Sequence, residues 1–79
     1  MIREEVWVDE SGIAVRYNLA FINHFLHQRD NGRVLGYDNA HGVHHRHYFG
    51  KVEAISATSF EQAANLFRDE VNELRKRER

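Results

Sequence analysis

The stretch Ile13-Ala-Val-Arg-Tyr-Asn-Leu-Ala-Phe-Ile-Asn23 decides the fold that we predict for this chain. Every second residue in it is large and apolar: Ile13, Val15, Tyr17, Leu19 and Phe21. A strand places alternate side chains on one face, whereas a helix would scatter these five around its circumference. The pattern therefore predicts a β-strand over residues 13–23, with this set of side chains against the core.

Three further strands are expected around this one. They are predicted at residues 3–9, 33–38 and 43–50, the last extending toward Ile55. The first is rich in β-branched and aromatic residues, which favour strands. Turn signals separate the strands at Glu10-Ser11-Gly12, Asp30-Asn31-Gly32 and Asn39–Gly42, because Asn and Gly tolerate the backbone angles of tight turns. Short turns of this kind predict antiparallel neighbours.

The final segment changes from a period of two to a helical period. Its apolar residues are spaced by three and four: Phe60, Ala63, Ala64, Phe67, Val71 and Leu74. Thr58 and Glu61 have the spacing of a helix capping box, and the basic run Arg75-Lys76-Arg77 suits the negative end of a helix dipole. The sequence thus predicts one small α+β domain over residues 1–79. It would be a four-stranded antiparallel meander followed by one C-terminal amphipathic helix packed on one face.

Length and composition restrict the class of protein. Seventy-nine residues make one small domain, and the chain has no cysteine, which excludes disulfides and thiolate metal sites. No apolar run approaches the roughly 18 residues that a membrane span needs, and the opening residues lack the pattern of a signal peptide. We therefore expect a cytoplasmic protein with no membrane association.

Charge is distributed unevenly along the chain. Residues 11–52 carry five basic and two acidic side chains together with all six histidines, whereas the remaining residues carry six basic and ten acidic side chains. The central segment is therefore the part expected to attract a polyanion such as RNA.

The densest chemistry lies between Gly36 and His47. The candidate catalytic residues in this stretch are His41, His44, His45, His47, Asp38 and Arg46. The ordinary pKa of a histidine side chain, about 6.5, lies closest to neutral pH of all side chains, so clustered imidazoles offer proton donors, proton acceptors or metal ligands. If the strands on either side of the turn pair, Asp38 and His44 lie close together at its mouth. Alternation then sends His45 and His47 to one face and His44, Arg46 and Tyr48 to the other.

The first hypothesis for this stretch is acid–base catalysis on RNA. Cleavage without a metal needs one group to take the proton of the 2′-hydroxyl and another to protonate the leaving 5′-oxygen, and imidazoles suit both tasks. A guanidinium can stabilise the charge that develops on the phosphate, and Asp38 can orient one ring. The residues expected to contact nucleic acid are Arg33, Arg46, Lys51 and Tyr48.

Two other interpretations remain open. His45 and His47 are spaced to chelate a metal from one strand face, with Asp38 or His41 completing the site, but this spacing matches no zinc motif and we assign neither metal nor cofactor. Alternatively, the histidines are surface residues that bond only to water and to their neighbours.

The run from Arg33 to His47 resembles the TumE-type toxins of bacterial toxin–antitoxin modules. The matching parts are the turn Asp38-Asn39-Ala40-His41, the cluster His44, His45 and His47, and the Thr58–Glu61 cap. The resemblance covers residues 2–75. It implies an antitoxin partner, and analogy with other small toxins suggests an activity directed at RNA. The alternative is a non-enzymatic binding module whose partner is an antitoxin, a second copy of the chain in a homodimer, or a metal.

Overall fold

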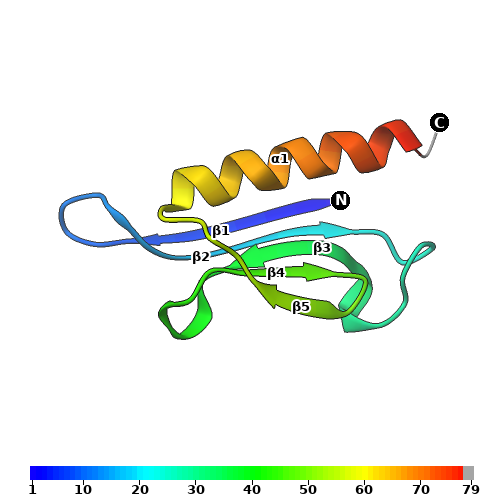
Figure 1. Ribbon diagram of the computed structural model, residues 1–79, viewed down its shortest axis with the longest axis horizontal. Helices are drawn as coiled ribbons and strands as arrows, with labels where there is room; N and C mark the ends of the chain where they lie inside the picture. Colours follow the sequence, from blue (N-terminus) through cyan, green and yellow to red (C-terminus); the bar gives the residue numbers. More distant parts are fainter. Residues whose placement is uncertain (78–79) are drawn as a thin grey trace.

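The computed structural model describes residues 1–77, apart from the side chain of His41. One antiparallel sheet is covered on one face by one helix, as Figure 1 shows. The strands are β1 (Ile2–Val8), β2 (Ala14–Ile22), β3 (Arg33–Asp38), β4 (His45–Tyr48) and β5 (Lys51–Ala54). Two short 3-10 turns, Asp30–Gly32 and Ala40–Gly42, flank β3, and the helix α1 runs from Phe60 to Arg77. The strands lie in sequence order, so the predicted meander and α+β class are confirmed.

The predicted strand count of four is wrong, because the fourth strand turns back on itself. Tyr48 pairs directly with Lys51, and the two residues between them, Phe49 and Gly50, have left-handed φ angles of 48° and 83°. Two such angles in succession are typical of the tight two-residue turns that join hairpin strands. Residues 43–55 therefore form β4 and β5 rather than one extended strand.

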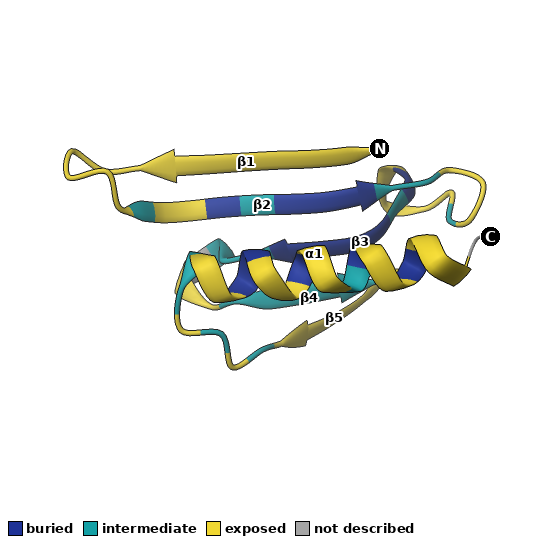
Figure 2. Cartoon of the chain, turned by 90° about the horizontal axis from the view of Figure 1, so that it is seen from above, coloured by how far each residue is buried: buried dark blue, intermediate teal, exposed yellow. Residues whose placement is uncertain are grey.

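The core lies between α1 and the middle of the sheet. Tyr17, Leu19 and Phe21 of β2 are buried, as the alternation predicts. They pack with buried side chains of β3 and α1: Leu35, Tyr37, Ala63, Ala64, Phe67, Val71 and Leu74. Figure 2 shows this burial along β2, β3 and one side of the helix. The helical pattern read from the sequence is thus the buried face of α1.

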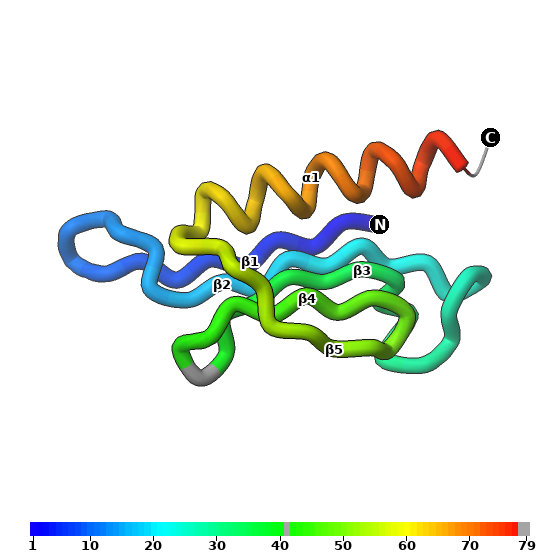
Figure 3. Tube along the Cα trace, in the orientation of Figure 1, coloured from blue at the N-terminus to red at the C-terminus, as the bar shows by residue number. Residues whose placement is uncertain are grey.

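Two residues of the predicted core set are exposed. Ile13 and Val15 are 62% and 54% exposed, contrary to the expectation that they face the core. The first hairpin projects past the start of α1, as the chain trace in Figure 3 shows, so the helix does not cover this end of the sheet. The alternation is also interrupted here, because Trp7 pairs with Arg16 but Val8 pairs with Ala14, which leaves Val15 as the extra residue of a β-bulge.

The helix begins one residue later than its predicted cap. Ser59 Oγ accepts a hydrogen bond from the Gln62 backbone N–H at 3.2 Å. Gln62 in turn accepts bonds from the backbone N–H and hydroxyl of Thr58, at 2.8 and 3.0 Å. Ser59 therefore caps the helix, and the Gln62 side chain bonds back to Thr58 rather than to Ser59, so the predicted capping box of Thr58 and Glu61 is wrong.

Candidate functional site

The sheet has one face without a helix, and two of the predicted histidines lie on it. We call this the open face, and its central residues are Asn18, Ala20, Gly36, Asp38, His45 and His47. The register places His45 directly opposite Asp38 and His47 opposite Gly36. His45, rather than His44, is thus the histidine paired with Asp38 across the two strands.

Asp38 contacts both histidines of the open face. Its Oδ2 lies 2.7 Å from His47 Nε2, and its Oδ1 lies 3.6 Å from His45 Nδ1. The backbone N–H of Ala40 donates to Oδ1 at 3.2 Å and helps to hold the carboxylate in place. The sequence predicts that Asp38 orients one imidazole ring. In the structure, its carboxylate lies against two.

His47 is held from both sides of its ring. Arg33 Nη2 lies 3.1 Å from His47 Nδ1. Because a guanidinium has no acceptor, Nδ1 accepts this bond and Nε2 carries the proton that is donated to Asp38. The two contacts together thus favour one tautomer of His47. Its side chain is 16% exposed, whereas that of His45 is 28% exposed.

Gly36 provides the space for the contact between Arg33 and His47. A Cβ atom at position 36 would lie 2.6 Å from Arg33 Cδ, closer than real Cβ contacts allow. Arg33 therefore lies across the sheet over this glycine. Its Nε also donates to Asp30 Oδ2 at 2.7 Å, which fixes the direction of the guanidinium. Arg33, which the sequence predicts as a nucleic-acid contact, thus binds His47, and the spacing of the two residues does not predict this contact.

Asn39 ties the turn of the site to β2, a role that the sequence analysis does not predict. Its Oδ1 accepts from the Tyr17 backbone N–H at 2.9 Å, and its Nδ2 donates to the Val15 carbonyl at 3.0 Å. The side chain thus continues the hydrogen-bond ladder past the end of β3. Its only signal in the sequence is its position directly after Asp38 in a turn.

The other candidate residues lie on the helix side or at the edge of the sheet. His44 Nδ1 lies 2.6 Å from the Tyr17 hydroxyl, and the two rings stack. Burial, followed by the charge of Asp38, raises the pKa of Tyr17 to about 12, so the phenol keeps its proton at neutral pH. Lys51 is exposed at the start of β5. The main chain of His41 is in the Ala40–Gly42 turn, and its side chain lies outside the described residues.

Arg46 is bound to carboxylates under the helix. It contacts Glu70 of α1 at 2.5 Å and Glu53 of β5 at 2.9 Å, and its guanidinium lies over the Tyr48 ring. Its pKa is raised chiefly by the bond to Glu70. Burial alone would raise the pKa of Glu70, but bonds from Arg46 and from the Tyr37 hydroxyl hold it below its ordinary value. The structure therefore places Arg46 and Tyr48 away from His45 and His47, as alternation predicts.

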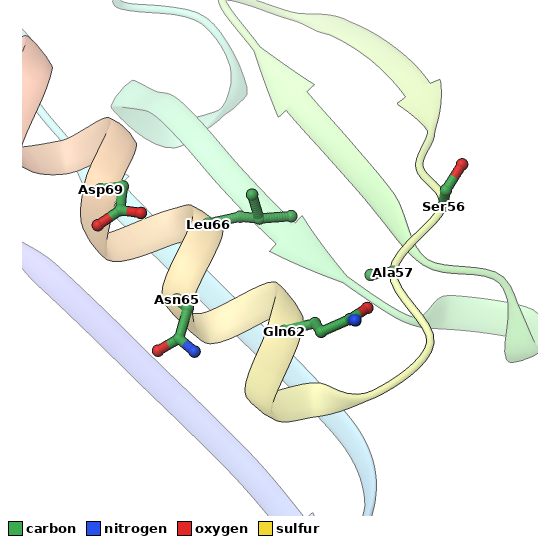
Figure 4. A pocket seen from close by; sticks show the side chains of 6 residues that line it. All are labelled: Ser56, Ala57, Gln62, Asn65, Leu66 and Asp69. Carbon is green, nitrogen blue, oxygen red and sulfur yellow. The ribbon is translucent and has the colours of Figure 1, made fainter.

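One hollow on the helix side contains none of the candidate residues. Its volume is about 430 Å³, and it lies between α1 and the segment that leads into the helix, lined by side chains such as Gln62, Leu66 and Asp69 (Figure 4). Among the described side chains, no group of three or more His, Asp or Glu residues is arranged to hold a metal ion. No helix within residues 1–77 is long and apolar enough to cross a membrane.

The model of one protein family, described as Toxin TumE, matches residues 1–78. The chain belongs to the TumE toxin family. The match covers nearly the whole chain, so the open-face cluster and the helix both lie within the family's extent. No curated protein and no solved structure matches this TumE family member. Membership of a toxin family implies an antitoxin partner.

Proposed function

We propose that this chain is a toxin that cleaves RNA without a metal ion, in the cytoplasm, with Asp38, His45, His47 and Arg33 as its reacting group of side chains. The observation that carries the proposal is the single carboxylate of Asp38 placed between two imidazoles on the open face. Acid–base catalysis needs two proton-transfer groups near one phosphate. Among the described side chains, those of His45 and His47 lie together beside Asp38 on the open face.

His45 is the proton acceptor in this scheme. Asp38 faces its Nδ1, so a proton on Nδ1 leaves the lone pair of Nε2 directed away from the carboxylate. Nε2 takes the proton of the 2′-hydroxyl as that oxygen attacks the phosphorus. Its greater exposure, 28% against 16% for His47, gives the substrate hydroxyl access to the ring.

Arg33 and His47 complete the reaction. When Arg33 turns from His47 onto the phosphate, its guanidinium neutralises the charge that develops on the phosphate oxygens. Nδ1 of His47 is then released to carry a proton, and the adjacent Asp38 stabilises the resulting imidazolium. The bond from phosphorus to the 5′-oxygen breaks, and that oxygen takes the proton from His47. The products are a 2′,3′-cyclic phosphate and a 5′-hydroxyl.

The test is incubation of the purified protein with single-stranded RNA in excess EDTA, followed by analysis of the product ends. We expect cleavage with cyclic phosphate and 5′-hydroxyl ends, and a bell-shaped dependence of the rate on pH, because one imidazole must be neutral and the other protonated. Absence of cleavage of free RNA and of ribosome-bound RNA would refute the proposal. Cleavage that requires a divalent metal would refute it as well.

A second candidate function is a binding module without catalysis, with an antitoxin or a second copy of the chain as its partner. The observation that favours it is the first hairpin, where apolar side chains are exposed: Val6, Trp7, Val8, Ile13 and Val15. All seven residues of β1 are exposed, and its outer edge pairs with no other described strand. Free strand edges of this kind accept a further strand. Light scattering of the isolated chain, and with its antitoxin, separates a homodimer from a complex of two proteins.

A further inference from the structure

A hollow on the open face adjoins the candidate site and shares a residue with it. Its volume is about 180 Å³, and its lining includes Arg3 of β1, Asn18 and Ala20 of β2, Asp30 and Arg33. Arg33 is the residue that also contacts His47. A molecule held at the histidines can therefore extend into this hollow without leaving the sheet.

The register forms a row across four strands from the hollow to the histidines. Arg3 is opposite Ala20, Ala20 is opposite Gly36, and Gly36 is opposite His47. Neighbouring strands lie about 4.8 Å apart, so the row spans roughly 14 Å between its ends. The two middle residues are the smallest available, and the space above Gly36 is taken by the Arg33 side chain. An extended chain that crosses the strands along this row therefore meets the Arg33 guanidinium between Arg3 and His47.

The adjacent row on the same face has the opposite electrostatic character. It runs from Glu5 through Asn18 and Asp38 to His45. The two carboxylates in this row, those of Glu5 and Asp38, repel phosphate. The first row contains Arg3 and runs beneath the guanidinium of Arg33, whose own partner across the strands is Ile22. The one carboxylate in the hollow, that of Asp30, is bound to Arg33 Nε at 2.7 Å. A sugar–phosphate backbone therefore follows the row that contains Arg3.

Asn18 belongs to the second row, lines the hollow together with Ala20 of the first row, and has an unpaired polar atom. Its Oδ1 is buried and has no hydrogen-bond partner among the described residues. Buried polar atoms are nearly always paired in folded proteins, so an unpaired atom in a side chain that lines a hollow indicates a group that completes it. The amino or imino edge of a nucleobase supplies such a donor, and a phosphate, which only accepts, does not.

We propose that this hollow binds the nucleotide next to the reacting phosphate of a single-stranded RNA, with Arg3 on the phosphate of that nucleotide and Asn18 on its base. The inference rests on the proposed function, since it assumes that RNA reacts at His45 and His47. It extends that function by assigning a specificity-determining site to β1 and β2, which carry none of the candidate catalytic residues.

The test is equilibrium binding of a 2′-deoxy single-stranded oligonucleotide, which lacks the attacking hydroxyl and cannot be cleaved. Wild type, Arg3→Gln and Arg68→Gln are compared over a range of salt concentrations. Arg68 is the matched control, because it is an exposed arginine that lies near Glu4 on the helix side. We expect Arg3→Gln to raise the Kd about three- to fivefold, the worth of one exposed ion pair. The slope of log Kd against log salt should fall by about 0.7, the value for one phosphate contact on a single strand. Arg68→Gln should change neither quantity.

The possible outcomes distinguish failure of the proposed nucleotide site from failure of the proposed catalysis. If Arg3→Gln keeps the wild-type Kd and slope, or if wild type does not bind the probe, the assignment of the hollow is overturned, even where wild type cleaves RNA. If wild type binds the probe through Arg3 but cleaves no RNA, the hollow stands as a nucleotide site and the catalytic proposal fails. A polyglutamate peptide that displaces the probe with the same dependence on Arg3 would assign the hollow to an acidic protein partner and overturn a nucleotide site.

Discussion

Asp38 is the residue on which the geometry of the site depends. It contacts His47 at 2.7 Å and His45 at 3.6 Å, and it is itself held by the Ala40 backbone N–H. Asn39 anchors the same turn to β2 through two bonds to backbone groups. The motif Asp38-Asn39-Ala40 thus combines an orienting carboxylate, an anchoring carboxamide and a backbone donor in three consecutive residues.

Replacement of Asp38 by Asn should remove most of the activity. The carboxamide keeps the shape of the side chain but loses the charge that stabilises a protonated His47 and fixes the tautomer of His45. We expect the rate of RNA cleavage in EDTA to fall by about 10²-fold or more, the usual contribution of an acid–base group. Asp69→Asn, an exposed change on α1, is the control and should keep the wild-type rate. Full activity in Asp38→Asn would show that the carboxylate does not orient the reacting groups.

Gly36→Ala should act through Arg33. The new methyl group would lie 2.6 Å from Arg33 Cδ, so the arginine must leave the position from which it turns onto the phosphate. We expect about a tenfold lower cleavage rate with little change in Tm, because the Arg33 side chain is outside the apolar core and can move without disturbing it. In an Arg33→Ala background, Gly36→Ala should cause no further loss. Additive losses in the double variant would contradict this coupling.

The sequence predicts one part of the site and misses another. The shared face of His45 and His47 follows from strand alternation, which needs no knowledge of packing. The contact between Arg33 and His47 does not follow, because it depends on a register shift between Phe21 and Ile22 and on the space left by Gly36. Interactions that depend on irregular register are fixed by the three-dimensional pairing rather than by spacing along the chain.

Among the strands and the helix, the β4–β5 hairpin is the element that the sequence pattern does not predict. Its turn, Phe49-Gly50, lacks the Asn-Gly or Asp-Gly signal that usually marks a two-residue hairpin. Phe49 keeps its left-handed φ in a packed setting: its backbone N–H donates to Val34 O at 2.9 Å, and its ring packs against Tyr48 and His27. By contrast, α1 and residues 17–21 of β2 are predicted correctly because their periodic apolar pattern and their burial agree.

Gly50→Ala tests whether this turn exists. A residue with a Cβ at a φ of 83° is strained, so we expect a loss of about 1–2 kcal/mol in the free energy of unfolding, measured by urea denaturation. Ala54→Gly in β5 is a useful comparison, since it weakens a strand without straining a turn. An unchanged free energy of unfolding in Gly50→Ala would favour one continuous strand over residues 43–55.

The helix is held to the sheet by a charged cluster as well as by the apolar core. Glu70→Gln removes the ion pair with Arg46 and weakens the bond from Tyr37, so we expect a loss of about 1–2 kcal/mol at neutral pH. Because the pKa of Glu70 is held below its ordinary value of 4.5, its contribution is complete above pH 4.5 and is lost as pH falls through the lower pKa of the folded state. The difference between wild type and Glu70→Gln should therefore shrink in acid. A difference that stays constant down to pH 2 would contradict the pairing.

At the scale of the whole molecule, the side chains that stabilise the fold and the candidate catalytic side chains lie on opposite faces of the sheet. The helix side holds the core together with Arg46, Glu70, Tyr17 and His44, whereas the open face holds Asp38, His45 and His47. Substitutions on the helix side should therefore lower Tm, and substitutions on the open face should lower activity at nearly constant Tm. Because the fold is one helix packed on one sheet, the sheet has one face for the core and one face on which a site can lie.

The most direct test of the catalytic account compares His45→Gln with His24→Gln in RNA cleavage under excess EDTA. His24 is an exposed histidine of the loop between β2 and β3, outside the Asp38 cluster, and so controls for the loss of an imidazole. The account predicts that His45→Gln loses about 10²-fold or more of the cleavage rate while it keeps the wild-type Tm, and that His24→Gln cleaves as wild type does. Equal rates for wild type and His45→Gln would contradict it.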